Sequence, residues 1–210
     1  MSTPTPRRPW APITTWRLAC AAAALSLSAC AVPQAPATKR VYDFGPTTAA
    51  AAAPGASAFA GPLALAEIEA PLALDSTALH YRLAYANAQE LRPYALARWS
   101  MPPAQLVQQR VRARLSTLGP VLVPGEGVPA HTLRIELEEF SQQFDAPGSS
   151  QGLVQLRATL LKGTALVAQR SFSATAPAAS ADAAGGVSAL AAATEDAASQ
   201  LSAWVAHSLR

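Results

Sequence analysis

Residues 132–140 read TLRIELEEF, and this stretch decides the fold because its apolar and charged side chains alternate. Leu133, Ile135 and Leu137 fall on one side of an extended chain, and the other side is charged: Arg134, Glu136 and Glu138. A period of two is typical of a strand that has one face in a core and the other in water. The stretch therefore predicts a half-buried β-strand.

The residues that follow predict two more strands. Residues 147–150, PGSS, are a turn signal, and apolar residues then alternate with polar ones from Val154 to Leu160. A second turn at residues 162–164, KGT, leads into another strand over residues 166–174. Consecutive strands joined by short turns form an antiparallel meander.

Two segments have helical rather than strand spacing. After the prolines at 102–103, apolar residues recur at helical intervals up to Leu118, and Gly119-Pro120 ends the segment. After the glycines at 185–186, an alanine-rich segment carries one apolar stripe: Val187, Leu190, Ala197, Leu201, Trp204 and Val205. Both patterns predict amphipathic helices.

Upstream of the first helix, residues 63–70 and 79–85 also alternate, which predicts two further strands, with His80 on the polar face of the second. Residues 94–100, YALARWS, are bracketed by prolines and predict a short irregular stretch. The element order is then strand, strand, helix, three strands and helix. This order predicts an α+β two-layer domain in which two helices pack on a mostly antiparallel sheet of about five or six strands.

The N-terminal residues look like a bacterial lipoprotein signal. Arginines precede an apolar run over residues 18–29, and Cys30 follows this run directly, which gives LSAC at residues 27–30. About a dozen residues are too few for a transmembrane helix, which needs roughly 20. We expect cleavage before Cys30 and lipidation of its thiol. An ordinary secretory signal beside a cysteine, or an uncleaved anchor, is the alternative.

Residues 1–29 are thus predicted to be a signal peptide, residues 30–62 a lipidated cysteine with an Ala/Pro-rich tether, and residues 63–210 the folded domain. Such a tether has too little large apolar surface to offset the entropy of ordering it. Within it, the residues at 41–44, VYDF, have the aromatic and β-branched content of a strand. An edge strand and a loop both remain open for this segment.

Removal of the signal changes the charge balance. The chain has 16 Lys and Arg against 13 Asp and Glu, and three arginines precede Cys30, so the mature part has 13 of each. A neutral domain offers no electrostatic reason to bind nucleic acid. Since Cys20 lies in the signal and Cys30 is expected to carry lipid, no cysteine is left for a disulfide or a thiolate metal site.

We expect no catalytic site and no G-x-S-x-G serine elbow in this sequence. His80, His131 and His207 lack metal-ligand spacing and are expected to be surface or capping residues. The glutamates at 136, 138 and 139 are expected to form a solvated strand face, and there is no G-x-x-x-x-G-K-[ST] phosphate loop. We therefore expect a non-enzyme with no cofactor and no metal.

Taken together, several of these motifs resemble the ABC-type transport auxiliary lipoprotein family. The resemblance is carried by the lipobox, the aromatic 41–44 segment, the 81–85 strand, Arg98-Trp99 with the prolines that follow, the 133–144 strand, and a last helix that begins near Gly186-Val187 and ends in Trp204-Val205. PqiC-like members of this family accompany MCE-type lipid transport systems.

The resemblance implies a periplasm-facing lipoprotein that works with an MCE-domain protein, an inner-membrane permease and an ATPase, and it permits a homo-oligomer. Ala31, rather than Asp, after the lipidated cysteine favours the outer membrane. A structural or assembly lipoprotein that supports another outer-membrane or cell-wall complex is the alternative function.

Four residues are candidates for contact with a partner or a lipid: Arg98, Trp99, Arg110 and Arg114. A guanidinium beside an indole can bind a lipid phosphate or stack on a partner. The alternative places Trp99 in the core under the helix, Arg98 on a backbone carbonyl, and the helix arginines on a solvated face.

Overall fold

β6 (His131–Ala146) contains the alternating residues 132–140, and the other strands are arranged around it. In this computed structural model, residues 38–46, 59, 61–123 and 125–210 are described, and all of them belong to one unit, Thr38–Arg210. The predicted signal peptide, Cys30 and most of the predicted tether lie outside the described residues.

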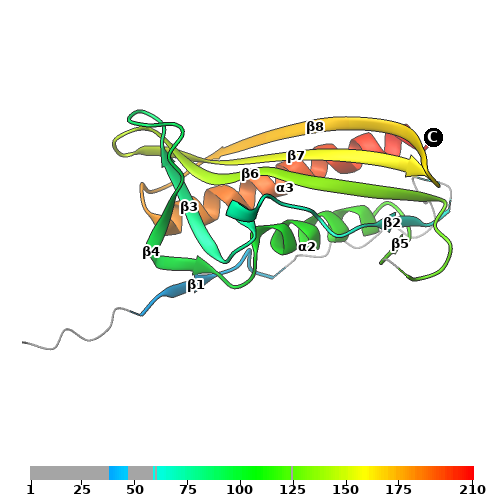
Figure 1. The fold of residues 1–210 in the computed structure, drawn as a ribbon, viewed down its shortest axis with the longest axis horizontal. Helices are drawn as coiled ribbons and strands as arrows, with labels where there is room; N and C mark the ends of the chain where they lie inside the picture. Colours follow the sequence, from blue (N-terminus) through cyan, green and yellow to red (C-terminus); the bar gives the residue numbers. More distant parts are fainter. Residues whose placement is uncertain (1–37, 47–58, 60, 124) are drawn as a thin grey trace, which may run out of the picture. The chain divides into compact units, whose positions relative to one another are not determined.

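One edge of β6 pairs with a single long strand, and the other edge is shared by two short strands (Figure 1). β7 (Ser149–Lys162) runs antiparallel to β6, and β8 (Ala165–Pro177) runs antiparallel to β7. β2 (Leu63–Leu65) pairs in parallel with the beginning of β6, and β3 (Ala78–Leu83) pairs in parallel with its end. The predicted meander is confirmed.

The remaining strands extend this arrangement. β4 (Arg92–Trp99) pairs antiparallel with β3, β1 (Arg40–Tyr42) pairs in parallel with β4, and β5 (Val121–Leu122) pairs in parallel with β2. A 3-10 helix, η2 (Leu72–Leu74), lies between β2 and β3. The α+β class is confirmed, although the described sheet has eight strands instead of five or six and is mixed because its short pairings are largely parallel.

β4 replaces the short irregular stretch that the prolines predicted. Pro93 pairs with His80, and Ala78 pairs with Arg98, so the register shifts strongly between the two pairs. The shift bends β4, as Figure 1 shows, and one arm continues along β3 while the other receives β1. At Pro93, β4 has β3 as its neighbour on one side and no strand on the other, because β1 joins it only at residues 97–99. Prolines are tolerated at such edge positions.

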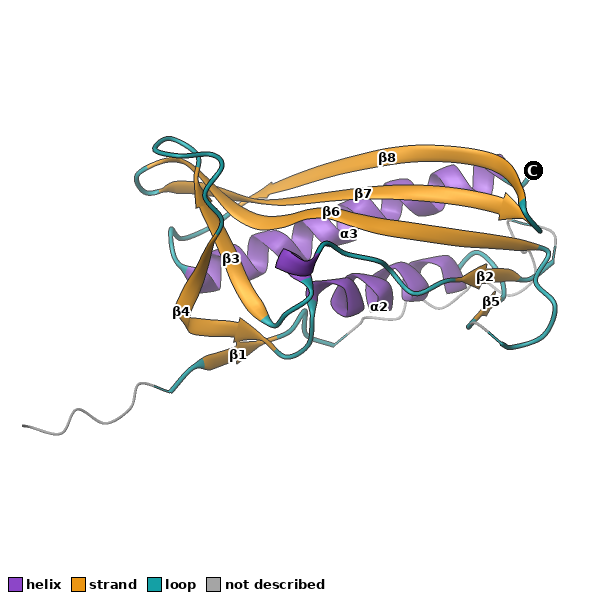
Figure 2. Ribbon diagram, in the orientation of Figure 1, coloured by secondary structure: helices purple, strands orange, loops and turns teal. Residues whose placement is uncertain are grey.

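Two helices cover the apolar side of the long strands. α3 (Ala183–Ser208) lies along β7 and β8, and α2 (Pro103–Ser116) lies beside α3 (Figure 2). Both predicted helices are confirmed, and their apolar stripes enter one core together with the inward residues of β6. The largest fully buried aliphatic side chains in that core include Leu106, Leu115, Leu133, Ile135, Leu137, Leu156 and Leu160.

A bulge in β6 explains the double glutamate of the opening stretch. Leu137 pairs with Leu156 and Glu139 pairs with Gln155, so Glu138 is the extra residue. A bulge inserts one residue without a partner and shifts the alternation after it. Phe140 therefore returns to the core side, where it is 1% exposed.

Two glycines mark where α3 approaches the sheet closely. A Cβ on Gly152 would lie 2.6 Å from backbone atoms of Ala189 and Leu190, and a Cβ on Gly186 would lie 2.1 Å from Oε1 of Gln142. Gln142 is fully buried, accepts from the Tyr94 hydroxyl at 2.8 Å and donates to Ser150 at 2.7 Å. Burial raises the pKa of Tyr94 to about 12, which keeps this hydroxyl protonated as a donor.

Candidate functional site

The segment at 41–44, which the sequence left open, is bound to the domain by aromatic packing. Tyr42 pairs with Trp99 in the β1–β4 ladder, and the Tyr42 carbonyl accepts from the Ser100 amide at 2.7 Å. Phe44 then packs edge-on against Trp99 and beside Phe140, with ring centroids 5.6 Å and 6.2 Å away. β1 is therefore an edge strand of the sheet, and its C-terminal end closes over the core.

Arg110 holds the same segment from the α2 side. Its Nη2 donates to the Phe44 carbonyl and, at 3.0 Å, to the Gly45 carbonyl, and its guanidinium lies 5.7 Å from the centroid of the Phe44 ring. A planar guanidinium suits this combination of carbonyl binding and stacking on an aromatic face. Arg110 thus fastens the strand that leads toward the predicted anchor.

We expect Arg110→Met to loosen β1 while the rest of the domain stays folded. Hydrogen bonds from a charged donor contribute about 1.5–3 kcal/mol, so the amides of Arg40 to Tyr42 should exchange with solvent about 10–100 times faster. Hydrogen exchange followed by mass spectrometry measures this. Arg112→Met on the same helix is the matched control, and equal exchange in both variants would contradict the role of Arg110.

The other candidate contact residues lie in different environments. Trp99 is fully buried and also packs against Phe140 at 5.6 Å, so the structure favours its core role over a contact role. Arg114 donates to the Ser199 hydroxyl at 3.2 Å and so links α2 to α3. Arg98 is exposed on β4, and no carbonyl cap for it is found among the described residues.

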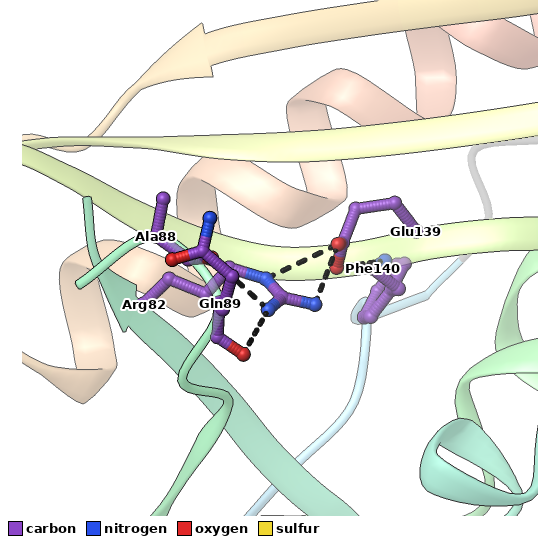
Figure 3. Close-up of polar contacts among 5 residues, drawn as sticks. All are labelled: Arg82, Ala88, Gln89, Glu139 and Phe140. Atoms are coloured by element: carbon purple, nitrogen blue, oxygen red, sulfur yellow. Dashed lines mark hydrogen bonds and ion pairs between the residues drawn. The ribbon is translucent and has the colours of Figure 1, made fainter.

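A polar cluster that the sequence did not predict lies on the face of β6 away from the helices (Figure 3). Arg82 donates through Nε and Nη2 to one oxygen of Glu139, at 3.2 Å and 2.9 Å, and through Nη1 to the carbonyls of Ala88 and Gln89. The second oxygen of Glu139 accepts from the Phe140 amide at 3.0 Å. Both carboxylate oxygens are therefore engaged, and Glu139 is a structural ion-pair partner.

His80 corrects one expectation, because it is 9% exposed instead of lying on a solvated face. The register of β3 on β6 places it beside Ser141, which is fully buried, and both His80 Nδ1 and Ser141 Oγ lack a hydrogen-bond partner within the described part of the chain. Burial lowers the pKa of His80 below its usual value, although Glu139 acts in the opposite direction. A fully buried serine presents no nucleophile at the surface.

Other titratable residues lie where the sequence predicted them. Glu136 and Glu138 are exposed on the outer face of β6, and Glu138 pairs with Arg157. His131 is half-buried at the beginning of β6, and His207 is exposed in the last turn of α3. No group of three or more His, Cys, Asp or Glu that could hold a metal ion occurs among the described residues.

Residues 148–152, GSSQG, fit the G-x-S-x-G spacing of serine hydrolases, so the expectation that this spacing is absent was wrong. In those enzymes the serine lies on a turn between a strand and a helix. Here the motif runs from the β6–β7 turn into the first residues of β7, and Ser150 is 8% exposed and accepts from Nε2 of Gln142. The serine therefore lies in a strand of a hairpin, and its hydroxyl belongs to the buried network.

A surface hollow of about 420 Å³ lies between α2 and the chain that joins β2 to β3. Its walls are mostly polar and include both charge signs: Glu67, Asp75, Gln105, Gln108, Gln109 and Arg112. Sites for apolar ligands are lined predominantly by apolar side chains. This hollow is thus poorly suited to an acyl chain. In the part of the chain that is described, no helix is both long and apolar enough to span a bilayer.

Comparison with solved structures identifies relatives of the fold. Protein XCC0632 from Xanthomonas campestris is 22% identical and superposes with a TM-score of 0.66, over 81% of this chain and 93% of that chain. A second crystal structure, of an uncharacterized protein, is 17% identical with a TM-score of 0.60, over 82% of this chain and 99% of that chain. No curated protein sequence matches the chain significantly.

The family comparison covers most of the chain. The model of the ABC-type transport auxiliary lipoprotein component matches residues 42–202, from the end of β1 to the last turns of α3. This span includes the Trp99 cluster, the Arg110 contact, the Arg82–Glu139 pair and the glycines under α3. The resemblance seen in the sequence is confirmed, and the chain belongs to the ABC-type transport auxiliary lipoprotein component family.

Proposed function

We propose that this protein is a non-catalytic auxiliary lipoprotein of an MCE-type ABC transport system, anchored in the outer membrane and facing the periplasm. The family match over residues 42–202 carries the proposal, together with the lipobox that ends at Cys30. Ala31 after the cysteine supports outer-membrane sorting. The transported molecule belongs to the class of lipids or other lipophilic compounds.

The protein would act by docking to its partners. Its polar hollow beside α2 favours contact with other proteins over enclosure of an acyl chain. The polar side chains beneath the loop at 84–91 bind one another; Arg82, for example, donates two hydrogen bonds to Glu139. Energy for transport would come from the ATPase component, and the permease and MCE-domain protein would form the path.

Co-purification tests this proposal directly. The mature protein, tagged after Arg210 and extracted with its lipid in mild detergent, should bring down an MCE-domain protein together with a permease and an ATPase. A Cys30→Ala variant, solubilised and captured in the same way, is the control for membrane context. Recovery of the lipoprotein alone, or with an outer-membrane barrel or cell-wall fragments, would instead support the structural or assembly alternative.

A further inference from the structure

The outer face of the β1–β4 pair carries exposed cations and apolar side chains together. Leu96 and Arg98 alternate along β4 with the buried Ala97 and Trp99, so they lie on the side away from the core. Val41 lies opposite Arg98 in the parallel register. Leu96 is 54% exposed and Val41 is 51% exposed. We call Lys39, Val41, Leu96 and Arg98 the β1–β4 face.

The cations of this face are free to bind an anion. Arg98 and Lys39 are exposed, and neither side chain has a hydrogen bond or ion pair within the described residues. In contrast, Arg82, Arg92, Arg134 and Arg157 each pair with a glutamate. Two carboxylates lie near this face: Asp43, which accepts from the Gly45 amide, and Asp182, which lines a hollow with Leu96 and is close to the cation of Arg40. Since Arg40 offsets Asp182, and Lys39 and Arg98 together outweigh Asp43, the cations are in excess. The face therefore keeps a positive excess beside its apolar side chains.

The position of this face relative to Cys30 limits what it can meet. Only ten peptide steps separate Cys30 from Arg40 at the beginning of β1. An extended chain reaches at most about 3.6 Å per residue, so a lipid on Cys30 keeps β1 within roughly 36 Å of the bilayer. Arg110 and Trp99 in turn fix β1 to the domain. The bilayer is therefore always within reach of the side of the domain that carries β1.

We propose that the β1–β4 face lies against the membrane, with Arg98 and Lys39 at anionic lipid headgroups and with Val41 and Leu96 in the interface. Basic residues near an anionic leaflet are attracted to it, and apolar side chains between them enter the headgroup region. This inference rests on the proposed anchoring at Cys30. The orientation specifies which side of the domain faces the lipid. The opposite end, which includes the β7–β8 turn, remains accessible to partners.

A single fluorescent probe in the lipidated protein tests the orientation. The mature chain has no free thiol besides any that is introduced, because Cys20 leaves with the signal and Cys30 carries the lipid. An environment-sensitive fluorophore on Leu96→Cys should be quenched by quencher-labelled lipid in vesicles of phosphatidylcholine and phosphatidylglycerol. The same probe on Ser171→Cys, on the outer face of β8, should not be quenched.

Reversing the charge of Arg98 provides a second test of the orientation. Arg98→Glu should lower quenching of the Leu96 probe about twofold or more in anionic vesicles, and this difference should shrink at high salt. Lys162→Glu in the β7–β8 turn is the matched control and should leave quenching unchanged.

The outcomes separate the two proposals. If the protein washes off the vesicles and carries no acyl mass, the anchoring at Cys30 fails. If it stays bound but the Leu96 probe is quenched no more than the Ser171 probe, the orientation alone is overturned. Protection of the Leu96 probe only after a partner protein is added would also overturn it, because the face would then be a protein-docking surface.

Discussion

Replacing Cys30 with Ala is expected to abolish acylation and to remove the mature protein from the outer-membrane fraction. The proposed attachment point is the thiol of Cys30, and alanine has no group that can receive the diacylglyceryl unit. Each buried CH₂ of an acyl chain contributes about 0.8 kcal/mol to membrane binding, so the loss of the chains changes partitioning by many orders of magnitude. Fractionation with intact mass spectrometry measures both effects, and the variant should accumulate as an unprocessed or mislocalised form.

Cys20→Ala is the matched control for this experiment. Cys20 lies inside the apolar run of the predicted signal, where alanine preserves the hydrophobic character. This variant should keep its acyl mass and its place in the membrane. An acyl mass that persists in Cys30→Ala, or one that disappears in Cys20→Ala, would show that the lipobox has been assigned to the wrong cysteine.

Trp99→Ala is expected to cause the largest loss of stability among single substitutions in the aromatic cluster. The indole is fully buried between Phe44 and Phe140, and large-to-small changes at aromatic core positions cost about 3–5 kcal/mol. Since domains of this size are stable by about 5–15 kcal/mol, the variant should unfold at much lower urea concentration. Circular dichroism is the suitable probe, because the substitution removes one of the two tryptophans that follow Cys30.

Trp99→Phe separates packing from hydrogen bonding. Trp99 Nε1 has no hydrogen-bond partner among the described residues, so phenylalanine removes no bond and keeps most of the ring contacts. We expect this variant to lose less than half as much stability as Trp99→Ala. Similar losses in the two variants would mean that the indole nitrogen has a partner, and that the packing argument is incomplete.

The elements that the sequence predicted well are those with local, repeated patterns. The alternation in β6 and β7 and the apolar stripes of α2 and α3 repeat over many residues, so each repeat supports the same assignment. Turn signals at 147–150 and 162–164 added the antiparallel connections. Leu63, Leu65 and Ile68 are buried as expected, although only Leu63–Leu65 forms a regular strand.

The elements that it missed or left open depend on partners far away along the chain. β1 is only three residues long and becomes a strand because β4 lies beside it, and β4 bends at a register shift that no local signal announces. His80 entered the interior because β3 joins the end of β6, where Arg82 and Glu139 cover the same face. Arg82 and Glu139 are 57 residues apart, and no periodic pattern connects them.

The candidate residues divide in the same way. The proposed lipidation of Cys30 rests on a short contiguous motif, whereas spacing alone could not show whether Trp99 and Arg110 face solvent or the core. Whether a tryptophan beside an arginine faces solvent or the core depends on Phe44, which approaches from 55 residues upstream of Trp99. Arg98 and Trp99 are neighbours along the chain yet point to opposite sides of β4, because adjacent strand residues alternate.

The shared edge of β6 sets the order in which the molecule can be completed as the chain emerges from its N-terminal end. β2 and β3 emerge early, but their parallel partner is not present until residues 131–144 have followed. The last part of the chain contains β6, β7, β8 and α3, which follow one another directly, so it can assemble from contacts between neighbouring elements. β2 and β3 instead need partners far along the chain. A chain that ends before β6 therefore has strands without their pairing partner, and exposed, unpaired strand edges favour aggregation.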